Sequence, residues 1–277
     1  DAEETLSLPV RGIVEDHTAR FRLTGDEALA YDALLPLIRE IAAGQRTNTV
    51  IKIGGGNDAD ASVIFAEKPE DFSIHLLMNA LQSDFPSELL WNSTYSNSFS
   101  FSQKDGILNY FIFRLRVDPA CQNGDEYTLD PNKLPPIMEA KTTAQRIVDQ
   151  YEGKSDAEKL RGYWTEILNM TDFAEAPGDS KENINPWKLT SVFDGDPSTE
   201  TAAVGYADAF QYLCTLGGLV SYRVNGRCNQ TSHAWNIVAL DGYNYLVDPA
   251  NGSLLLAGGV ETEDGKYICT DPSGNAI

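Results

Sequence analysis

The stretch that decides the fold begins at Ala203 with A-V-G-Y-A-D-A-F-Q-Y-L-C and resumes at Ser232 with S-H-A-W-N-I-V-A-L-D-G-Y-N-Y-L-V-D-P. In the first part, Ala203, Ala207, Phe210 and Cys214 recur at three- and four-residue spacing, which predicts one buried face of a helix. The second part predicts two strands joined by a two-residue turn at Asp-Gly, a strong hairpin signal. A helix followed by an antiparallel strand pair indicates an α+β fold.

The turn determines which residues of the two strands oppose each other. With Asp and Gly at its centre, His233 pairs with Ala250 and Trp235 pairs with Asp248. His233 and Asp248 are then diagonal neighbours on one face, about 7–8 Å apart at Cα. Their side chains can close that gap, and the carboxylate would hold the imidazole in one tautomer. A turn one residue longer would change the faces and remove this prediction.

The segment Asp196-Pro-Ser-Thr-Glu200 is predicted to start the helix, because Asp or Ser can cap the first amides and Pro is tolerated in the first turn. Ala203 then lies near the amino end, where the helix dipole favours an anion. A cysteine at that position would have a lowered pKa. Gly205 and Ala207 are small enough for another backbone segment to pack closely against this turn.

Three motifs together resemble the transglutaminase-like superfamily, a group with a papain-like fold that includes secreted bacterial proteins. They are Gly205-Tyr206-Ala207, His233-Ala234-Trp235-Asn236 and Val247-Asp248-Pro249. The resemblance covers residues 191–252 and extends to the helices that begin near residue 137. It implies a transglutaminase-like core over residues 136–277, with helices packed on a small antiparallel sheet. Residues 1–135 would form an amino-terminal α/β region.

The resemblance implies acyl transfer by a thiol on peptide or protein amides. The family cysteine falls on Ala203, with His233 as general base and Asp248 orienting it. An oxyanion donor would also be needed, and the amide of residue 203, Trp187 and Asn185 are the candidates. The methyl group of Ala203 can neither attack a carbonyl nor hold an acyl group, so the chain as it stands is predicted to be inactive in this chemistry.

Three interpretations of this site stay open. In the first, the protein is a cysteine peptidase or transglutaminase-like enzyme, and Ala203 is an inactivating substitution. In the second, the alanine is natural and the cleft of a pseudoenzyme binds peptide or glycan without turnover. In the third, the chain is an interaction module of a bacterial cell-surface protein. The implied partner is a peptide or protein substrate, one associated with the cell wall being among the options.

No other cysteine is predicted to replace the missing thiol. Cys214 shares the helix face of Ala203 but lies about 16 Å farther along the axis, which indicates core packing. Cys228 is predicted in a loop, as a structural thiol or a disulfide partner. With Cys121 and Cys269, the four cysteines allow three pairings, and they lack the C-x-x-C spacing of a zinc site.

Composition excludes several partner classes. The 277 residues include 41 acidic and 21 basic side chains, a net charge of -20, which disfavours nucleic acid and anionic lipid. No stretch reaches the ~20 apolar residues that span a bilayer. The start at Asp1 fits a mature secreted protein or a cut chain, so an extracellular or cell-surface location is expected. No metal or cofactor is predicted, because EF-hand and P-loop patterns are absent.

The rest of the chain alternates between helical and extended patterns. Residues 118–136, rich in Pro, Gly and Asp, are predicted to be an internal boundary, and 172–185 a polar surface loop. A hairpin is predicted with strands at 97–102 and 109–117 around 103–106. The remaining predicted elements are helices at 26–43, 137–151 and 156–170, a helix that follows residues 68–72 and runs through 81, and strands at 6–14, 49–53 and 219–225.

Overall fold

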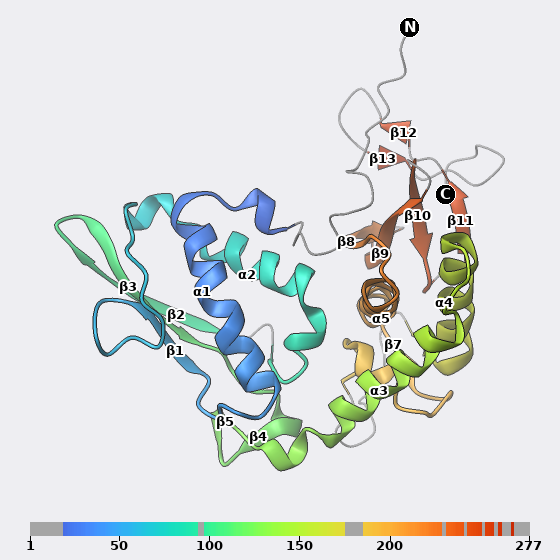
Figure 1. Ribbon diagram of the computed structural model, residues 1–277, viewed down its shortest axis with the longest axis horizontal. Coiled ribbons are helices and arrows are strands. Elements are labelled where there is room, and N and C mark those ends of the chain that lie inside the picture. The colour runs from blue at the N-terminus through green and yellow to red at the C-terminus, as the bar shows by residue number, and fades with distance from the viewer. Residues whose placement is uncertain are drawn as a thin grey trace, which may run out of the picture. The chain divides into compact units, whose positions relative to one another are not determined.

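The computed structural model describes residues 19–93, 97–174, 185–228, 231–240, 243–250, 253–257, 260–261 and 267–268 (Figure 1). The chain divides into two compact units, with the boundary between Ile137 and Met138. The strand predicted over residues 6–14 lies outside the described residues.

The first unit is built on a three-stranded antiparallel sheet in the order β1-β3-β2. Its strands are β1 (Val50–Gly54), β2 (Ser98–Lys104) and β3 (Ile107–Arg114). Ile51, Phe113 and Phe99 follow one another across the three strands and share a face, because alternate strand residues point the same way. Helix α1 (Gly25–Ala42) packs on β1, and α2 (Ile74–Asp84) packs on α1.

The predicted hairpin of this unit is confirmed, with a shorter turn than expected. Its strands run through Gln103 and Lys104, so only Asp105 and Gly106 form the turn. Both have positive φ, 54° and 81°, which a two-residue hairpin of this kind requires. The segment 118–136 also holds structure, a small hairpin of β4 (Gln122–Asn123) and β5 (Asp125–Leu129).

The second unit combines helices with a four-stranded antiparallel sheet, which confirms the predicted α+β class. The helices are α3 (Pro135–Gln150), α4 (Asp156–Met170) and α5 (Ala203–Leu216), close to their predicted bounds. The sheet has the order β11-β10-β9-β8. Its strands are β8 (Ser221–Cys228), β9 (Thr231–Leu240), β10 (Tyr243–Asp248) and β11 (Ser253–Ala257). A separate pair consists of β12 (Val260–Glu261) and β13 (Tyr267–Ile268).

Helix α5 lies against strands β8 and β9 of the sheet (Figure 1). The predicted face of Ala203, Ala207, Phe210 and Cys214 is buried along its whole length. On β9, Ala234, Asn236 and Val238 are buried in alternation, as expected for the strand face that meets a helix.

Two predictions around the start of α5 are wrong. Residues 196–200 do not cap the helix: Asp196 accepts hydrogen bonds from Ser198 in a local turn, and the residue before the helix, Ala202, makes no side-chain cap. Glu200–Thr201 instead forms strand β7, which pairs in parallel with β6 (Asp172–Phe173). Asp172 and Phe173 therefore belong to a strand, although a loop was predicted there, because the partner strand lies far away in sequence.

Candidate active site

His233 and Asp248 are joined by a hydrogen bond on the hairpin of β9 and β10. The predicted register is confirmed from Tyr243–Leu240 to Val247–Asn236. The Nε2 atom of His233 lies 2.8 Å from Oδ2 of Asp248. Their side chains are only 7% and 11% exposed, so water screens this pair weakly. The hairpin thus presents an imidazole whose orientation is set by a carboxylate.

Two aromatic rings contact the imidazole of His233. Trp235 stacks on it, with ring centres 6.2 Å apart and planes at 29°. Phe173 stands edge-on to it, at 6.4 Å and 86°, and makes a second edge contact with Tyr206 at 6.1 Å. Tyr206 lies one turn along α5 from Ala203. Phe173 therefore links the imidazole to the start of the helix, where position 203 lies.

Sequence reasoning missed Phe173, because nothing in its local sequence marks it. Its strand β6 is held against β7 by a chain of buried hydroxyl groups. Thr171 Oγ1 lies 2.7 Å from Thr201 Oγ1, and Thr201 donates to Ser191 Oγ at 2.8 Å. Ser191 in turn donates to the carbonyl oxygen of Lys188 at 2.7 Å. These bonds fix the strand that carries Phe173 beside β7, which ends two residues before Ala203.

Ala203 is the first residue of α5, at the position expected for the nucleophile. It is 8% exposed. The amides of Gly205 and Tyr206 donate to the carbonyl oxygen of Ala202, and the amide of Ala202 donates to Pro186. The amide of Ala203 has no acceptor within the described ranges. It lies at the positive end of the helix dipole and can donate a hydrogen bond to a developing oxyanion.

The turn at residues 185–188 runs along the first turn of α5, close to Gly205. A Cβ atom at Gly205 would lie 3.2 Å from the carbonyl oxygen of Pro186 and 3.1 Å from that of Lys188. This confirms that a small residue here admits a second backbone segment. Trp187, one of the predicted oxyanion candidates, lies on this turn and is 47% exposed, and its amide donates to Asn185 Oδ1 at 3.0 Å.

A buried polar network holds α5 on the sheet. Arg223 on β8 donates to both carboxylate oxygens of Asp208, at 2.7 and 2.9 Å. Burial raises the pKa of Asp208, and the positive charge of Arg223 lowers it in part. The backbone amide of Arg223 donates to Gln211, and the side chain of Asn236 donates to the carbonyl oxygen of Ala207 at 3.0 Å. These contacts position the helix relative to the strand of His233.

The described cysteines lie apart from the site. Cys214 is completely buried, and burial raises the pKa of its thiol. Cys228, predicted in a loop, is the last residue of β8 and pairs with Thr231. No disulfide joins Cys121, Cys214 and Cys228, and Cys269 lies outside the described residues.

The described part of the chain contains no cluster of three or more His, Cys, Asp or Glu residues suited to a metal ion. Among the helices of the same residues, none combines the length and the apolar character that a membrane span requires. His75, the other described histidine, lies on α2 in the first unit, and His17 lies outside the described residues.

Comparisons with known proteins give partial matches. No family model matches the chain. It is 27% identical to human kyphoscoliosis peptidase over 138 residues, which cover 43% of this chain and 20% of that protein. The mouse kyphoscoliosis peptidase is likewise 27% identical over 128 residues, or 42% and 18% of the two chains. The match thus spans about a fifth of the length of these curated relatives.

Solved structures also match part of the chain, at low identity. One is the periplasmic domain of TgpA from Pseudomonas aeruginosa bound to ethylmercury, with 12% identity and a TM-score of 0.31 over 58% of this chain and 67% of that chain. Another is a TGase, with 15% identity and a TM-score of 0.34 over 55% and 44% of the two chains. In sequence, the chain is similar over 43% of its length to a protein named a peptidase.

Proposed function

We propose that the chain derives its site from a thiol acyl-transfer enzyme of the transglutaminase-like or cysteine-peptidase kind. In this proposal Ala203 stands at the nucleophile position, the substrate is a peptide or protein, and the setting is extracellular or cell-surface. The observation that carries it is the buried hydrogen bond between His233 and Asp248, on a hairpin linked through Phe173 to the helix that begins at Ala203.

A cysteine at position 203 would supply the chemistry as follows. The thiol gives its proton to His233, and the thiolate sulfur attacks the carbonyl carbon of an amide. Because Nε2 of His233 is already bonded to Asp248, the nitrogen that accepts the thiol proton is Nδ1. The proton then passes to the departing amine, which leaves an acyl group on sulfur. Attack of water on that thioester would be hydrolysis, and attack of a second amine would be transfer. Either attack breaks the bond to sulfur and returns the thiol.

The surrounding residues fit this scheme in two respects. Asp248 would fix the tautomer of His233 and stabilise the imidazolium that forms in the first step. The amide of Ala203 would donate to the oxyanion of the tetrahedral intermediate, aided by the positive end of α5. The human relative named as a peptidase, similar over 43% of this chain, agrees with chemistry on amide bonds.

The alanine itself favours a second candidate function. As the chain stands, a methyl group at residue 203 supports no covalent step, so the same site would bind a peptide or glycan without turnover. Asp248 and His233 would then be kept because they pack and bond to each other. The two candidates differ in one property, the reactivity of a thiol placed at position 203.

That property can be measured with Ala203→Cys in a Cys228→Ser background, which removes the partly exposed thiol of β8. We expect iodoacetamide at neutral pH to modify residue 203 at least tenfold faster than the thiol of a Val204→Cys control. Val204 lies in the same first turn of α5 and is more exposed than Ala203, so it feels the same helix dipole but faces a different direction.

A further variant, His233→Ala with Ala203→Cys, should lose this advantage. Equal reactivity of cysteines at 203 and 204, or no effect of His233→Ala, would overturn the enzyme proposal and leave the binding function. Buried Cys214, whose thiol pKa is raised, should stay unmodified in all variants and serves as an internal reference.

A further inference from the structure

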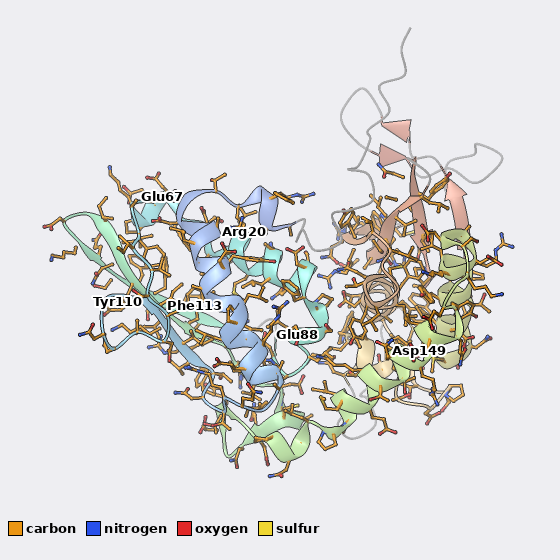
Figure 2. All side chains as sticks on the ribbon, viewed as in Figure 1. Arg20, Glu67, Glu88, Tyr110, Phe113 and Asp149 are labelled. Atoms are coloured by element: carbon orange, nitrogen blue, oxygen red, sulfur yellow. The ribbon has the colours of Figure 1, made fainter. Side chains whose placement is uncertain are left out.

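Gly226 lies inside strand β8, in a part of the protein where side chains are closely packed (Figure 2). A glycine in the interior of a strand weakens the strand, because it has no side chain to pack and loses more chain entropy than other residues. The φ angle of Gly226 lies outside the positive range that favours glycine, so its backbone would also accept alanine. The reason for a glycine here therefore lies in the space that a side chain would fill.

The ring of Trp235 occupies that space. A Cβ atom at Gly226 would lie 2.3 Å from Cη2 of Trp235 and 2.9 Å from Cζ3. Carbon atoms in contact pack at about 3.5–4.0 Å, so no side chain fits at residue 226 unless the indole moves. Both atoms belong to the six-membered ring, the end of the indole that is farthest from the backbone. Gly226 therefore leaves room for the far end of this ring.

The register of β8 and β9 explains how the indole reaches Gly226. Gly226 pairs with His233, whereas Trp235 pairs with Val224. Gly226 is thus a diagonal neighbour of Trp235, at a distance that an aromatic side chain can span. The indole leans toward residue 226 and, in the same direction, toward His233. There it stacks on the imidazole, with ring centres 6.2 Å apart and planes at 29°.

The stack supplies a constraint that the hydrogen bond to Asp248 lacks. That bond holds Nε2 of His233, which lies near the end of the ring opposite Cβ. The imidazole can still turn about its Cβ–Cγ bond, because this axis passes close to Nε2. Such a turn would move Nδ1, the other ring nitrogen. A flat indole against one face of the imidazole opposes the turn.

We propose that Gly226 and Trp235 are positioning residues for His233. Gly226 leaves the space that the indole needs, and the indole holds the plane of the imidazole, so that Nδ1 keeps one direction. The value of this arrangement for thiol chemistry at residue 203 rests on the proposed function, whereas the placement of the rings does not. Gly226→Ala would keep the strand but displace the indole and release the imidazole.

The first test observes the imidazole by NMR in the full chain, with Ala203 as it stands. The ring-proton resonances of His233 are assigned with His233→Gln. Trp235→Leu removes the indole and so defines the shift that the indole causes. We expect Gly226→Ala to move the His233 resonances in the same direction, by about half as much or more. Asn225→Ala, at the exposed neighbouring residue on the other face of β8, should leave them in place.

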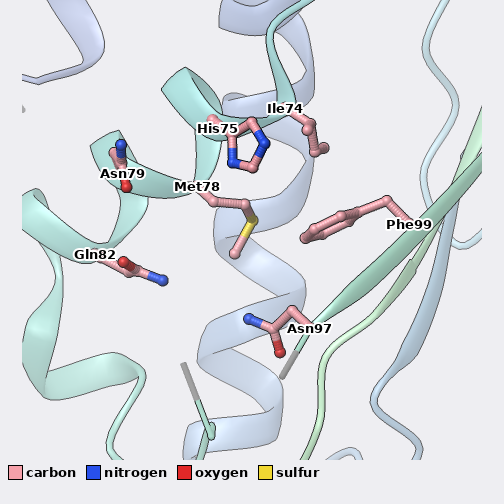
Figure 3. A pocket seen from close by; sticks show the side chains of 7 residues that line it. All are labelled: Ile74, His75, Met78, Asn79, Gln82, Asn97 and Phe99. Atoms are coloured by element: carbon pink, nitrogen blue, oxygen red, sulfur yellow. The ribbon is translucent and has the colours of Figure 1, made fainter. Parts of the chain in front are cut away.

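His75 provides an internal reference for these spectra. It lies on α2 in the first unit, where it lines a groove together with Met78 and Phe99 (Figure 3). Because its ring has these other neighbours, its resonances should keep their positions in every variant.

The second test measures thiol reactivity in the protein with Ala203→Cys and Cys228→Ser. We expect Gly226→Ala to slow iodoacetamide modification of residue 203 about threefold to tenfold, the range of one aromatic contact. Asn225→Ala should change the rate little. Trp235→Phe keeps a ring but lacks the far atoms of the indole. In that background Gly226→Ala should therefore have little further effect on the rate.

A comparison at residue 235 needs no change of Gly226. Trp235→Leu should slow the modification about threefold to tenfold, and Trp235→Phe should restore most of the rate, because a ring still covers the imidazole. This comparison decides the proposal even if Gly226→Ala fails to fold.

The proposal is overturned if Gly226→Ala leaves the His233 resonances unchanged, or if its effect on the rate is as large in the Trp235→Phe background. Where residue 203 reacts faster than the Val204→Cys control, equal rates for Trp235→Leu and Trp235→Phe overturn it too. The proposed function fails in a different way: the thiol at residue 203 would react no faster than that control. If the resonances still move as expected, the placement of the imidazole by Trp235 and Gly226 is supported without the chemistry.

Discussion

The ring of Phe173 stands edge-on to the imidazole of His233, with 6.4 Å between ring centres and 86° between planes. Phe173 comes from β6, whereas His233 comes from β9, and Phe173 also makes an edge contact with Tyr206 on α5. An aromatic contact of this kind is worth about 0.5–1.5 kcal/mol. Phe173 is thus a positioning residue for the imidazole, although it is distant from it in sequence.

We expect Phe173→Ala to slow iodoacetamide modification of the Ala203→Cys protein about threefold to tenfold, because the imidazole loses one of its two ring contacts. Phe173→Tyr should restore most of the rate, since it keeps the ring. The matched control is Phe101→Ala, which removes a 53% exposed ring from the first unit. If Phe101→Ala slows the reaction as much, the effect of Phe173 is not local.

Asp248 should matter more than Phe173, because it bonds directly to Nε2 of His233. Asp248→Asn is nearly isosteric but presents a donor or a weaker acceptor, which favours the wrong tautomer. In the Ala203→Cys protein, this change should lower the rate of thiol modification at least tenfold. Asp172→Asn, which removes a nearby carboxylate next to Phe173, should change the rate little. Equal effects of the two would indicate long-range charge rather than tautomer control.

Gly205 permits the close approach of three groups to α5. A Cβ atom there would lie 2.6 Å from Cγ2 of Thr201, as well as close to two backbone carbonyls. Gly205→Ala should therefore lower the free energy of unfolding by about 1–3 kcal/mol, measured by urea denaturation. In a Thr201→Ser background the methyl group is gone and the hydroxyl bonds remain possible. Gly205→Ala should then lower the free energy of unfolding by a smaller amount. Additive costs in this double-mutant cycle would contradict the contact.

The Asp208–Arg223 pair predicts a stability that depends on pH. Asp208→Leu leaves the guanidinium of Arg223 buried without its partner, and this group cannot deprotonate. The change should therefore lower the free energy of unfolding by about 3–5 kcal/mol at any pH between 4.5 and 7.5. Arg223→Met leaves a carboxyl group that can take up a proton, because burial already raises its pKa. A folded-state pKa above the unfolded value gives stability that is present at low pH and is lost as pH rises.

Arg223→Met should accordingly lower the free energy of unfolding, relative to the parent, by less at pH 4.5 than at pH 7.5, as measured by urea denaturation. The double variant, Asp208→Leu with Arg223→Met, should lie close to the parent, since neither charge is left unpaired. A deficit of Arg223→Met that grows on acidification would show that Asp208 stays ionised without its partner.

The sequence predicted the parts of the site that depend on local patterns. The two-residue turn set the register of His233 and Asp248, and helical spacing set the buried face that starts at Ala203. The parts that it missed depend on distant partners. Residues 196–200 carry a helix-capping pattern, yet the last of them, Glu200, belongs to strand β7, which pairs with Asp172–Phe173, 28 residues earlier. Tertiary pairing of this kind overrides a local preference that is worth about 1 kcal/mol.

The end of strand β8 shows the same limit of prediction from local sequence. Cys228 was predicted in a loop because the strand before it was expected to end at Asn225. In the structure β8 continues to Cys228 because β9 begins at Thr231 and pairs with it residue by residue. The end of a strand is thus determined by the length of its partner.

Residue 203 is nearly enclosed at the start of α5, and the described residues hold its backbone through neighbouring amides rather than through its side chain. An alanine and a cysteine differ there by a single sulfur atom, and His233 and Asp248 bond to each other whichever is present. The fold therefore places no demand on a thiol at this position: under the proposed function, one substitution at residue 203 would switch the chemistry while the hairpin stays as it is.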